Sequence, residues 1–154
     1  MNVIGIRCTP QIIYYSVINI DEDNFSYLNQ ELIIPKVFDI PNKLKYVRKT
    51  LLDIFREYNI QKAGIRVTEN NAQHPDKFRA MLEAVIQELI ASSEVSNYIT
   101  AVISTLSSRL NIPNDGTIKS VIDGIVPFSN IPKWNEIPLE FRESILSGFA
   151  SSTI

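Results

Sequence analysis

The first third of the chain consists of short apolar runs separated by turn-like breaks. Residues 2–8, 11–19 and 27–34 are rich in β-branched and aromatic side chains, which is typical of β-strands. Thr9-Pro10 and the polar stretch 21–24 separate these runs, and such short connections favour antiparallel neighbours. The second run is apolar at both alternating sets of positions, so we expect that strand to be covered on both faces.

Beyond residue 40 the apolar positions recur at spacings of three and four, which predicts helices. We expect helices over residues 42–58, 75–91 and 138–150, with Pro75 in the first turn of the second helix. Strands are expected over 62–68 and 98–103, and a short helix over 105–110. Residues 111–137 are interrupted by prolines and should hold little regular structure beyond a helical turn near 118–122.

Three antiparallel strands are thus followed by alternating strands and helices and by a terminal helix. This order predicts an α/β fold in which a mixed sheet of about five strands carries helices on both faces. A length of 154 residues fits one domain, spanning residues 1–154.

Composition narrows the class of protein. Apolar residues make up 45% and charged residues 21% of the chain, as in globular proteins. No apolar run is long enough to cross a bilayer, and the first ten residues lack the features of a secretory signal, so we expect a cytoplasmic protein without a membrane role. The formal net charge of −2 disfavours an autonomous nucleic-acid binder, although a local basic patch would override that balance.

The tripeptide Gly-Ile-Arg occurs twice near the end of an expected strand, at 5–7 and at 64–66. If the two strands are adjacent and parallel, Arg7 and Arg66 project from the carboxyl-end region where α/β sheets bind ligands. Gly5 and Gly64 lie on the same side as the arginines and would leave space there. The pair is therefore either a phosphate or carboxylate site or an internally neutralised pair. The candidate neutralising acids are Glu69, Glu83, Asp123 and Glu143.

Several segments resemble RNase H-like proteins of the Holliday-junction-resolvase branch, and more closely small uncharacterised bacterial proteins of that type. The segments are IGIR (4–7), KAGIRVTE (62–69), KFRAMLEAVIQELI (77–90) and, more weakly, ITAVISTLSSRL (99–110). The resemblance implies the RNase H-like fold, whose active members hold two divalent metals on strand-end and terminal-helix carboxylates.

At the positions matching the two strand-end acids this chain has Arg7 and Arg66, or Glu69 if the second strand is shifted by three residues. The terminal helix offers Glu140 and Glu143. An arginine cannot coordinate a cation, so the resemblance implies a two-metal site that is absent or badly damaged.

Our leading hypothesis is a catalytically degenerate RNase H-like domain that acts by binding nucleic acid, an anionic ligand or a protein partner. It needs no cofactor and would serve as a subunit of a nucleic-acid-processing or defence assembly. Its proposed anion contacts are Arg7, Arg66, Lys77 and Arg79. The alternative is an Mg²⁺- or Mn²⁺-dependent nuclease with a rearranged site made of Glu69, Glu83, Asp123 and Glu143.

A third hypothesis is a structural interaction module. The segment 125–134 places Phe128, Ile131 and Trp134 among prolines, so it either packs across the domain or offers an apolar patch to a partner. Packing is the favoured interpretation. For Cys8, whose side chain should point away from that of Arg7, burial is favoured over a role as a nucleophile.

Overall fold

The computed structural model describes all residues, 1–154, and its elements follow the expected order. The sheet contains β1 (Asn2–Cys8), β2 (Ile12–Asp21), β3 (Asn24–Ile33), β4 (Lys62–Arg66) and β5 (Asn97–Ala101). The helices are α1 (Ile40–Glu57), α2 (Lys77–Ser92), α3 (Ile103–Leu110), α4 (Thr117–Ile122) and α5 (Leu139–Ser152), with a 3₁₀ turn η1 (Trp134–Glu136).

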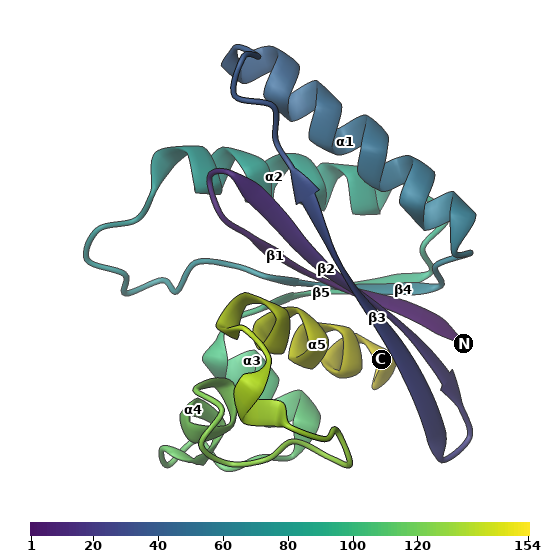
Figure 1. Ribbon diagram of the computed structural model, residues 1–154, viewed down its shortest axis with the longest axis vertical. Coiled ribbons are helices and arrows are strands. Elements are labelled where there is room, and N and C mark those ends of the chain that lie inside the picture. Colours follow the sequence, from purple (N-terminus) through teal and green to yellow (C-terminus); the bar gives the residue numbers. More distant parts are fainter.

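The five strands form one mixed sheet in the order β3-β2-β1-β4-β5. β1, β2 and β3 pair antiparallel through short turns, whereas β4 and β5 run parallel to β1 because a helix connects them. Figure 1 shows α1 and α2 on one face of the sheet and α3, α4 and α5 on the other. The predicted mixed α/β sheet is therefore confirmed.

Each face of the sheet has its own apolar core. One core joins strand residues such as Ile4 and Ile65 to α1 and α2, and the other joins Val3 and Ile18 to α3, α4 and α5. Ile13 and Ile18 of β2 are both fully buried although they belong to different cores, so β2 is covered on both faces as expected.

Capping residues explain where the helices begin. The Asp39 carboxylate accepts a hydrogen bond from the Asn42 backbone N–H at 3.0 Å, so α1 begins two residues before the expected position. Asp76 caps α2 in the same way through the Arg79 N–H at 2.7 Å. Pro75 therefore precedes the cap of α2 and is not in its first turn.

α5 lies directly on the backbone of the sheet. A Cβ atom added to Gly5 would come within 1.6 Å of the Ser144 carbonyl oxygen, and one added to Gly64 within 2.0 Å of the Ser147 carbonyl oxygen. Nine of the fourteen residues of α5 are buried, including the small polar residues Ser144, Ser147 and Ser151. This close approach brings the side chains of α5 to the carboxyl ends of β1 and β4. None of the helices is both long and apolar enough to cross a membrane.

Candidate functional site

The structure brings Arg7 and Arg66 together. β1 and β4 are adjacent and parallel, and the two arginines are direct partners in their register, as are Gly5 and Gly64. Both arginines lie next to the carboxyl end of their strand, which confirms the expected placement on one region of the sheet. The Arg66 residue is 6% exposed, so its charge needs a partner inside the protein.

Glu143 of α5 is that partner for both arginines. Its Oε1 lies 3.3 Å from Arg7 Nε and its Oε2 lies 2.6 Å from Arg66 Nε. The three side chains are at most 14% exposed, so the contacts are shielded from solvent and screened little by salt. One carboxylate from the last helix thus bridges two strands.

Glu69 supplies a second contact to Arg66. Its Oε1 lies 3.3 Å from Arg66 Nη2 and also accepts a hydrogen bond from the Ile103 backbone N–H at 2.7 Å. Ile103 is the first residue of α3, and a carboxylate is favourable at a helix N-terminus. Arg66 Nη1 donates to the carbonyls of Val67 at 2.7 Å and Ala101 at 3.2 Å. Arg66 and Glu69 therefore tie β4, β5 and α3 together.

Arg79 and Glu83 form the third pair of the site, one turn apart on α2. Arg79 Nε lies 2.9 Å from Glu83 Oε1. Glu83 also accepts hydrogen bonds from the backbone N–H of Thr68 at 3.0 Å and from its hydroxyl at 2.8 Å. Burial lowers the pKa of Arg79, and the positive charge of Arg7 lowers it further. The two guanidiniums are therefore close enough to repel each other.

We call these six residues the arginine–glutamate network. Its members are Arg7, Arg66, Arg79, Glu69, Glu83 and Glu143. The Nε–H groups of Arg66 and Arg79 are not aligned on their carboxylates, so those short contacts are charge pairs and not hydrogen bonds. Three guanidiniums and three carboxylates leave the network formally neutral.

The carboxylates of the network are paired with arginines. Each of its carboxylates already contacts a guanidinium, and no group of three or more His, Cys, Asp or Glu side chains is placed to hold a metal ion. Asp123, the fourth acid of the nuclease hypothesis, is exposed at the end of α4 and forms no ion pair. Lys77 is exposed at the first residue of α2 and also lies outside the network.

Gly5 and Gly64 do leave space beside the arginines, but the backbone of α5 fills it. The expectation of room for a ligand there is thus corrected by the contacts to Ser144 and Ser147. The sequence does carry a signal for this packing, since Ser144, Ser147, Gly148 and Ser151 recur at spacings of three, four and seven along α5. Such a stripe of small residues permits a close helix–sheet approach, which the spacing of apolar residues alone does not predict.

Cys8 is fully buried in the core under α1 and α2, as expected. Burial and the nearby Glu83 carboxylate raise the pKa of its thiol to about 12. A thiol in that state is a poor nucleophile at neutral pH, so Cys8 packs and does not react.

Within the segment 125–134, Ile131 and Trp134 pack against the domain, so these two residues cannot offer the apolar patch of the third hypothesis. These residues are 5% and 2% exposed, and Trp134 Nε1 donates to the Val121 carbonyl at 2.7 Å. Phe128 lies between the rings of Trp134 and Phe149, with centroid distances of 5.5 and 5.4 Å. This burial corrects the hypothesis of a docking surface for Ile131 and Trp134, whereas Phe128 is only partly buried.

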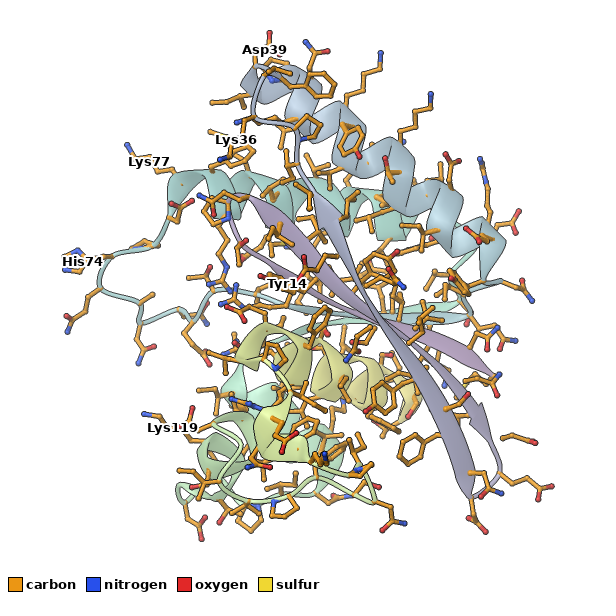
Figure 2. The ribbon with its side chains drawn as sticks, viewed as in Figure 1. Tyr14, Lys36, Asp39, His74, Lys77 and Lys119 are labelled. Atoms are coloured by element: carbon orange, nitrogen blue, oxygen red, sulfur yellow. The ribbon has the colours of Figure 1, made fainter.

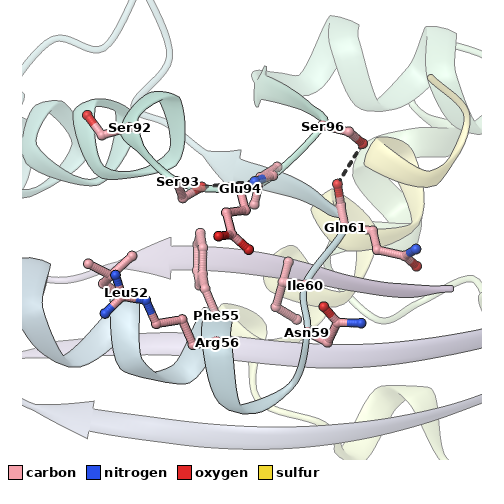
Figure 3. Close-up of a pocket in the computed structure, with 11 residues that line it drawn as sticks. Leu52, Phe55, Arg56, Asn59, Ile60, Gln61, Ser92, Ser93, Glu94 and Ser96 are labelled. Atoms are coloured by element: carbon pink, nitrogen blue, oxygen red, sulfur yellow. Dashed lines mark hydrogen bonds between the residues drawn. The ribbon is translucent and has the colours of Figure 1, made fainter.

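A surface cavity of about 560 Å³ lies at the opposite end of the parallel strands. It is lined by the end of α1, the residues before β4 and the α2–β5 connection (Figure 3). Ser96 Oγ donates to the Gln61 carbonyl at 2.9 Å, which joins the segments that precede β5 and β4. Ser93 Oγ donates to the Ile90 carbonyl at 2.7 Å within the turn that ends α2. The cavity is separate from the arginine–glutamate network.

Comparison with protein-family models finds no match, and comparison with curated proteins finds none. Solved structures do match. The structure of Thermus thermophilus RuvC aligns with a TM-score of 0.74 at 10% identity, covering 99% of this chain and 94% of that chain. T. thermophilus RuvC in complex with a Holliday junction substrate aligns with a TM-score of 0.68 at 8% identity and the same coverage.

The yeast mitochondrial Holliday junction resolvase Ydc2 aligns with a TM-score of 0.56 at 17% identity, covering 98% of this chain and 78% of that chain. This chain therefore has the RNase H-like fold of RuvC-like resolvases, as the sequence resemblance implied. Structural likeness at such low sequence identity establishes the fold alone, so the chemistry has to be argued from the residues of the site.

Proposed function

We propose that this RNase H-like domain binds nucleic acid without cleaving it, and that an arginine–glutamate network stands where resolvases hold metal ions. The observation that carries the proposal is the Glu143 carboxylate, shared between Arg7 at 3.3 Å and Arg66 at 2.6 Å. A terminal-helix carboxylate that would otherwise serve a metal is engaged by two fixed positive charges.

Electrostatics supports a non-catalytic role. A divalent cation entering between the strands would approach two guanidiniums, which repel it. To bind it, Glu143 would have to leave Arg66, whose side chain is 8% exposed. Breaking a buried ion pair in this way costs about 3–5 kcal/mol. The network is thus a stable substitute for a metal and not a vacant ligand set.

Nucleic acid is the partner class best supported by the fold and by the exposed cations. One of the structural neighbours, T. thermophilus RuvC, was solved with a Holliday junction substrate. Figure 2 shows Lys77 and His74 on the side where the β4–α2 loop projects. Lys77 is exposed and free of ion pairs, so it can contact a phosphate first, and Arg79 follows it on α2.

The net charge of the chain limits how strongly it can bind nucleic acid on its own. A formal net charge of −2 gives weak attraction to a polyanion away from this local patch. The proposal is therefore a subunit that contributes one contact surface to a nucleic-acid-processing or defence assembly. Arg7 and Arg66 become anion contacts only if a phosphate displaces Glu143.

The test is binding measured beside cleavage. Fluorescence anisotropy with a labelled four-way junction, a duplex and a single strand should give saturable binding at low salt. The same DNAs, incubated with the protein and Mg²⁺ or Mn²⁺, should remain uncut on denaturing gels. Absence of binding to all three, or metal-dependent cutting, would overturn the proposal.

A matched pair of variants locates the contact. Lys77→Glu should weaken binding several-fold and lower the salt slope by roughly 0.9 for one lost contact with duplex DNA. Lys119→Glu is the control, because Lys119 is also exposed but lies on α4 in the opposite layer (Figure 2). Equal losses in both variants would mean that binding is not localised at α2.

The rival function is a metal-dependent nuclease. It is favoured by one observation, the convergence of Glu69 and Glu143 on Arg66, with Glu83 close by on Arg79. In this arrangement the arginines would swing away when Mg²⁺ or Mn²⁺ and substrate bind together. It predicts Mn²⁺-dependent cleavage that Glu69→Gln abolishes, and Asp123→Asn should have no effect because Asp123 lies outside the network.

A further inference from the structure

β3 leaves one edge of the sheet open along ten residues. Its only hydrogen-bonded neighbour is β2. Asp21 and Asn24 close the β2–β3 turn as a pair, and Ile34 N–H donates to the Gln11 carbonyl on the β2 side. Even-numbered residues of β3 therefore bond to β2, and the odd-numbered ones from Phe25 to Ile33 direct their N–H and C=O groups outward.

This edge lacks the usual protection against pairing with another chain. Between Asn24 and Ile33 there is one charged residue, Glu31, and no lysine, proline or glycine. Natural edge strands are commonly short, charged or interrupted. The other edge strand, β5, has five residues, half the length of β3.

The two ends of β3 carry complementary features. Ile33 is 63% and Val37 91% exposed at its carboxyl end, and Lys36 lies between them. At its amino end a groove of about 330 Å³ is lined by residues 23–27 and by residues 130–132. The turn at that end, Asp21–Asp23, is entirely acidic and exposed.

We propose that a second copy of this chain pairs with β3 in antiparallel fashion, so that Asn29 faces its symmetry mate. In this register Phe25 of one copy is opposite Ile33 of the other, and opposed side chains in a sheet point to the same face. Ile33 then lies beside the groove whose wall includes Phe25. At each end of the paired strands, the exposed acidic turn Asp21–Asp23 of one copy comes near Lys36 of the other, so the two-fold axis places two such pairs of opposite charge in the interface.

The result is a ten-stranded sheet across a two-fold axis. Both copies use the same patch, as a closed dimer requires, so pairing ends at two chains and does not propagate. The exposed Ile33 and Val37, which no part of the single chain covers, gain apolar contacts. The strands that carry Arg7 and Arg66 of the arginine–glutamate network are β1 and β4, and neither of them is β3, so the inference does not depend on the proposed function.

Analytical ultracentrifugation of the full chain tests the pairing. The parent protein should sediment as a dimer at micromolar concentration. Ile33→Lys and Lys36→Glu should each raise the dimer dissociation constant at least about tenfold, with unchanged circular dichroism, because both residues are exposed. Glu22→Lys combined with Lys36→Glu should restore much of the affinity, whereas Lys49→Glu, the same reversal on α1, should have little effect.

A cross-link fixes the register. In Asn29→Cys the new thiols should form an intermolecular disulfide on mild oxidation, and Cys8 will not compete because it is fully buried. A parent that stays monomeric up to the highest soluble concentration overturns the proposal. So does a dimer that neither Ile33→Lys nor Lys36→Glu weakens, since its interface would then lie elsewhere on the surface.

Discussion

At the scale of single residues, the Glu143 carboxylate has a large energetic consequence. It is the counter-charge for two arginines that come from different strands and are themselves largely buried. Removing it leaves two guanidiniums close together in a low-dielectric setting, with only Glu69 nearby to offset Arg66. Loss of one member of a buried pair is far more costly than loss of both.

Glu143→Gln should therefore lower the free energy of unfolding by about 3–5 kcal/mol, measured by urea denaturation at pH 7. Glutamine keeps the size of the side chain, so the loss reports charge and not packing. The matched control is Glu136→Gln, because Glu136 pairs with Lys133 at 3.7 Å on the surface, where both side chains are more than 60% exposed. A surface pair contributes roughly 0–1 kcal/mol, so an equal effect in both variants would contradict a structural role for the network.

At the scale of elements, the position of α5 depends on glycine in two strands. The Ser144 carbonyl occupies the place of a side chain at Gly5, and the Ser147 carbonyl does the same at Gly64. The helix can come so close because its own contact residues are small. This approach is what lets Glu143 reach both arginines.

Gly5→Ala should destabilise the protein by at least about 3 kcal/mol, at the upper end of the overpacking range, because the added methyl meets backbone that cannot rotate away. Thermal unfolding followed by circular dichroism measures the effect. Gly116→Ala is the control, since Gly116 has a φ of 106° but nothing within 4 Å of an added Cβ. It should cost only the backbone strain of about 1–2 kcal/mol, and a larger loss there than at Gly5 would refute the packing account.

A second contact between elements joins α1 to α2 through Arg48 and Glu88. Hydrogen bonds from the Arg48 guanidinium and the Ser92 hydroxyl lower the pKa of Glu88 from its ordinary 4.5 to about 2. A depressed carboxyl pKa contributes stability that is fully present above pH 4.5 and is lost as the pH falls toward 2.

The melting temperature of the parent should therefore exceed that of Glu88→Gln at pH 7, and the difference should vanish by about pH 2. The difference should be small, because both side chains are exposed to solvent. Glu94→Gln, at an exposed acid without an ion pair, serves as the control. A difference for Glu88→Gln that is the same at both pH values would show that the ion pair is not its cause.

The sequence predicted the strands and helices because burial imposes periods of two and of three to four on the apolar residues. It predicted that Arg7 and Arg66 lie side by side, since both end a Gly-Ile-Arg strand. It could not select Glu143 over Asp123 as their partner. Glu143 is 136 residues from Arg7, and only the docking of α5 brings them together.

In α5 and β3, too, the sequence did not predict features that depend on contacts with other elements. The sequence treated α5 as a helix with one apolar face, but serines and a glycine also bury its other side, and hydropathy does not report that kind of contact. It placed the start of β3 at residue 27, whereas the β2–β3 turn is only Glu22 and Asp23, with Glu22 at a φ of 53°. Polar residues at the end of a paired strand have the composition of a loop, so the sequence alone does not show that they belong to the strand.

At the scale of the whole molecule, the fold is shared with metal-dependent resolvases, whereas the arginine–glutamate network places positive charges where a metal site would be expected. The fold is that of RuvC-like resolvases, and its carboxyl-end face is where the side chains of β1, β4 and α5 converge. The network fills that face with matched charges. If the arginines alone account for the difference, replacing them with the acids that active members of the fold carry should create a cation site on the existing scaffold.

The double variant Arg7→Asp, Arg66→Glu tests this idea. Without metal it should be less stable than the parent, because it gathers five carboxylates where three were balanced by arginines. Added Mn²⁺ should reverse that loss, and a concentration one hundred times the dissociation constant would stabilise the folded state by about 2.7 kcal/mol. The parent should show no shift in melting temperature with Mn²⁺, since Glu69, Glu83 and Glu143 each already contact a guanidinium.

Differential scanning fluorimetry with and without Mn²⁺ measures the melting temperatures of the parent and of the double variant. An equal Mn²⁺ shift in the parent would favour the nuclease alternative, and no shift in a folded double variant would mean that the geometry of α5, and not only the two arginines, prevents metal binding.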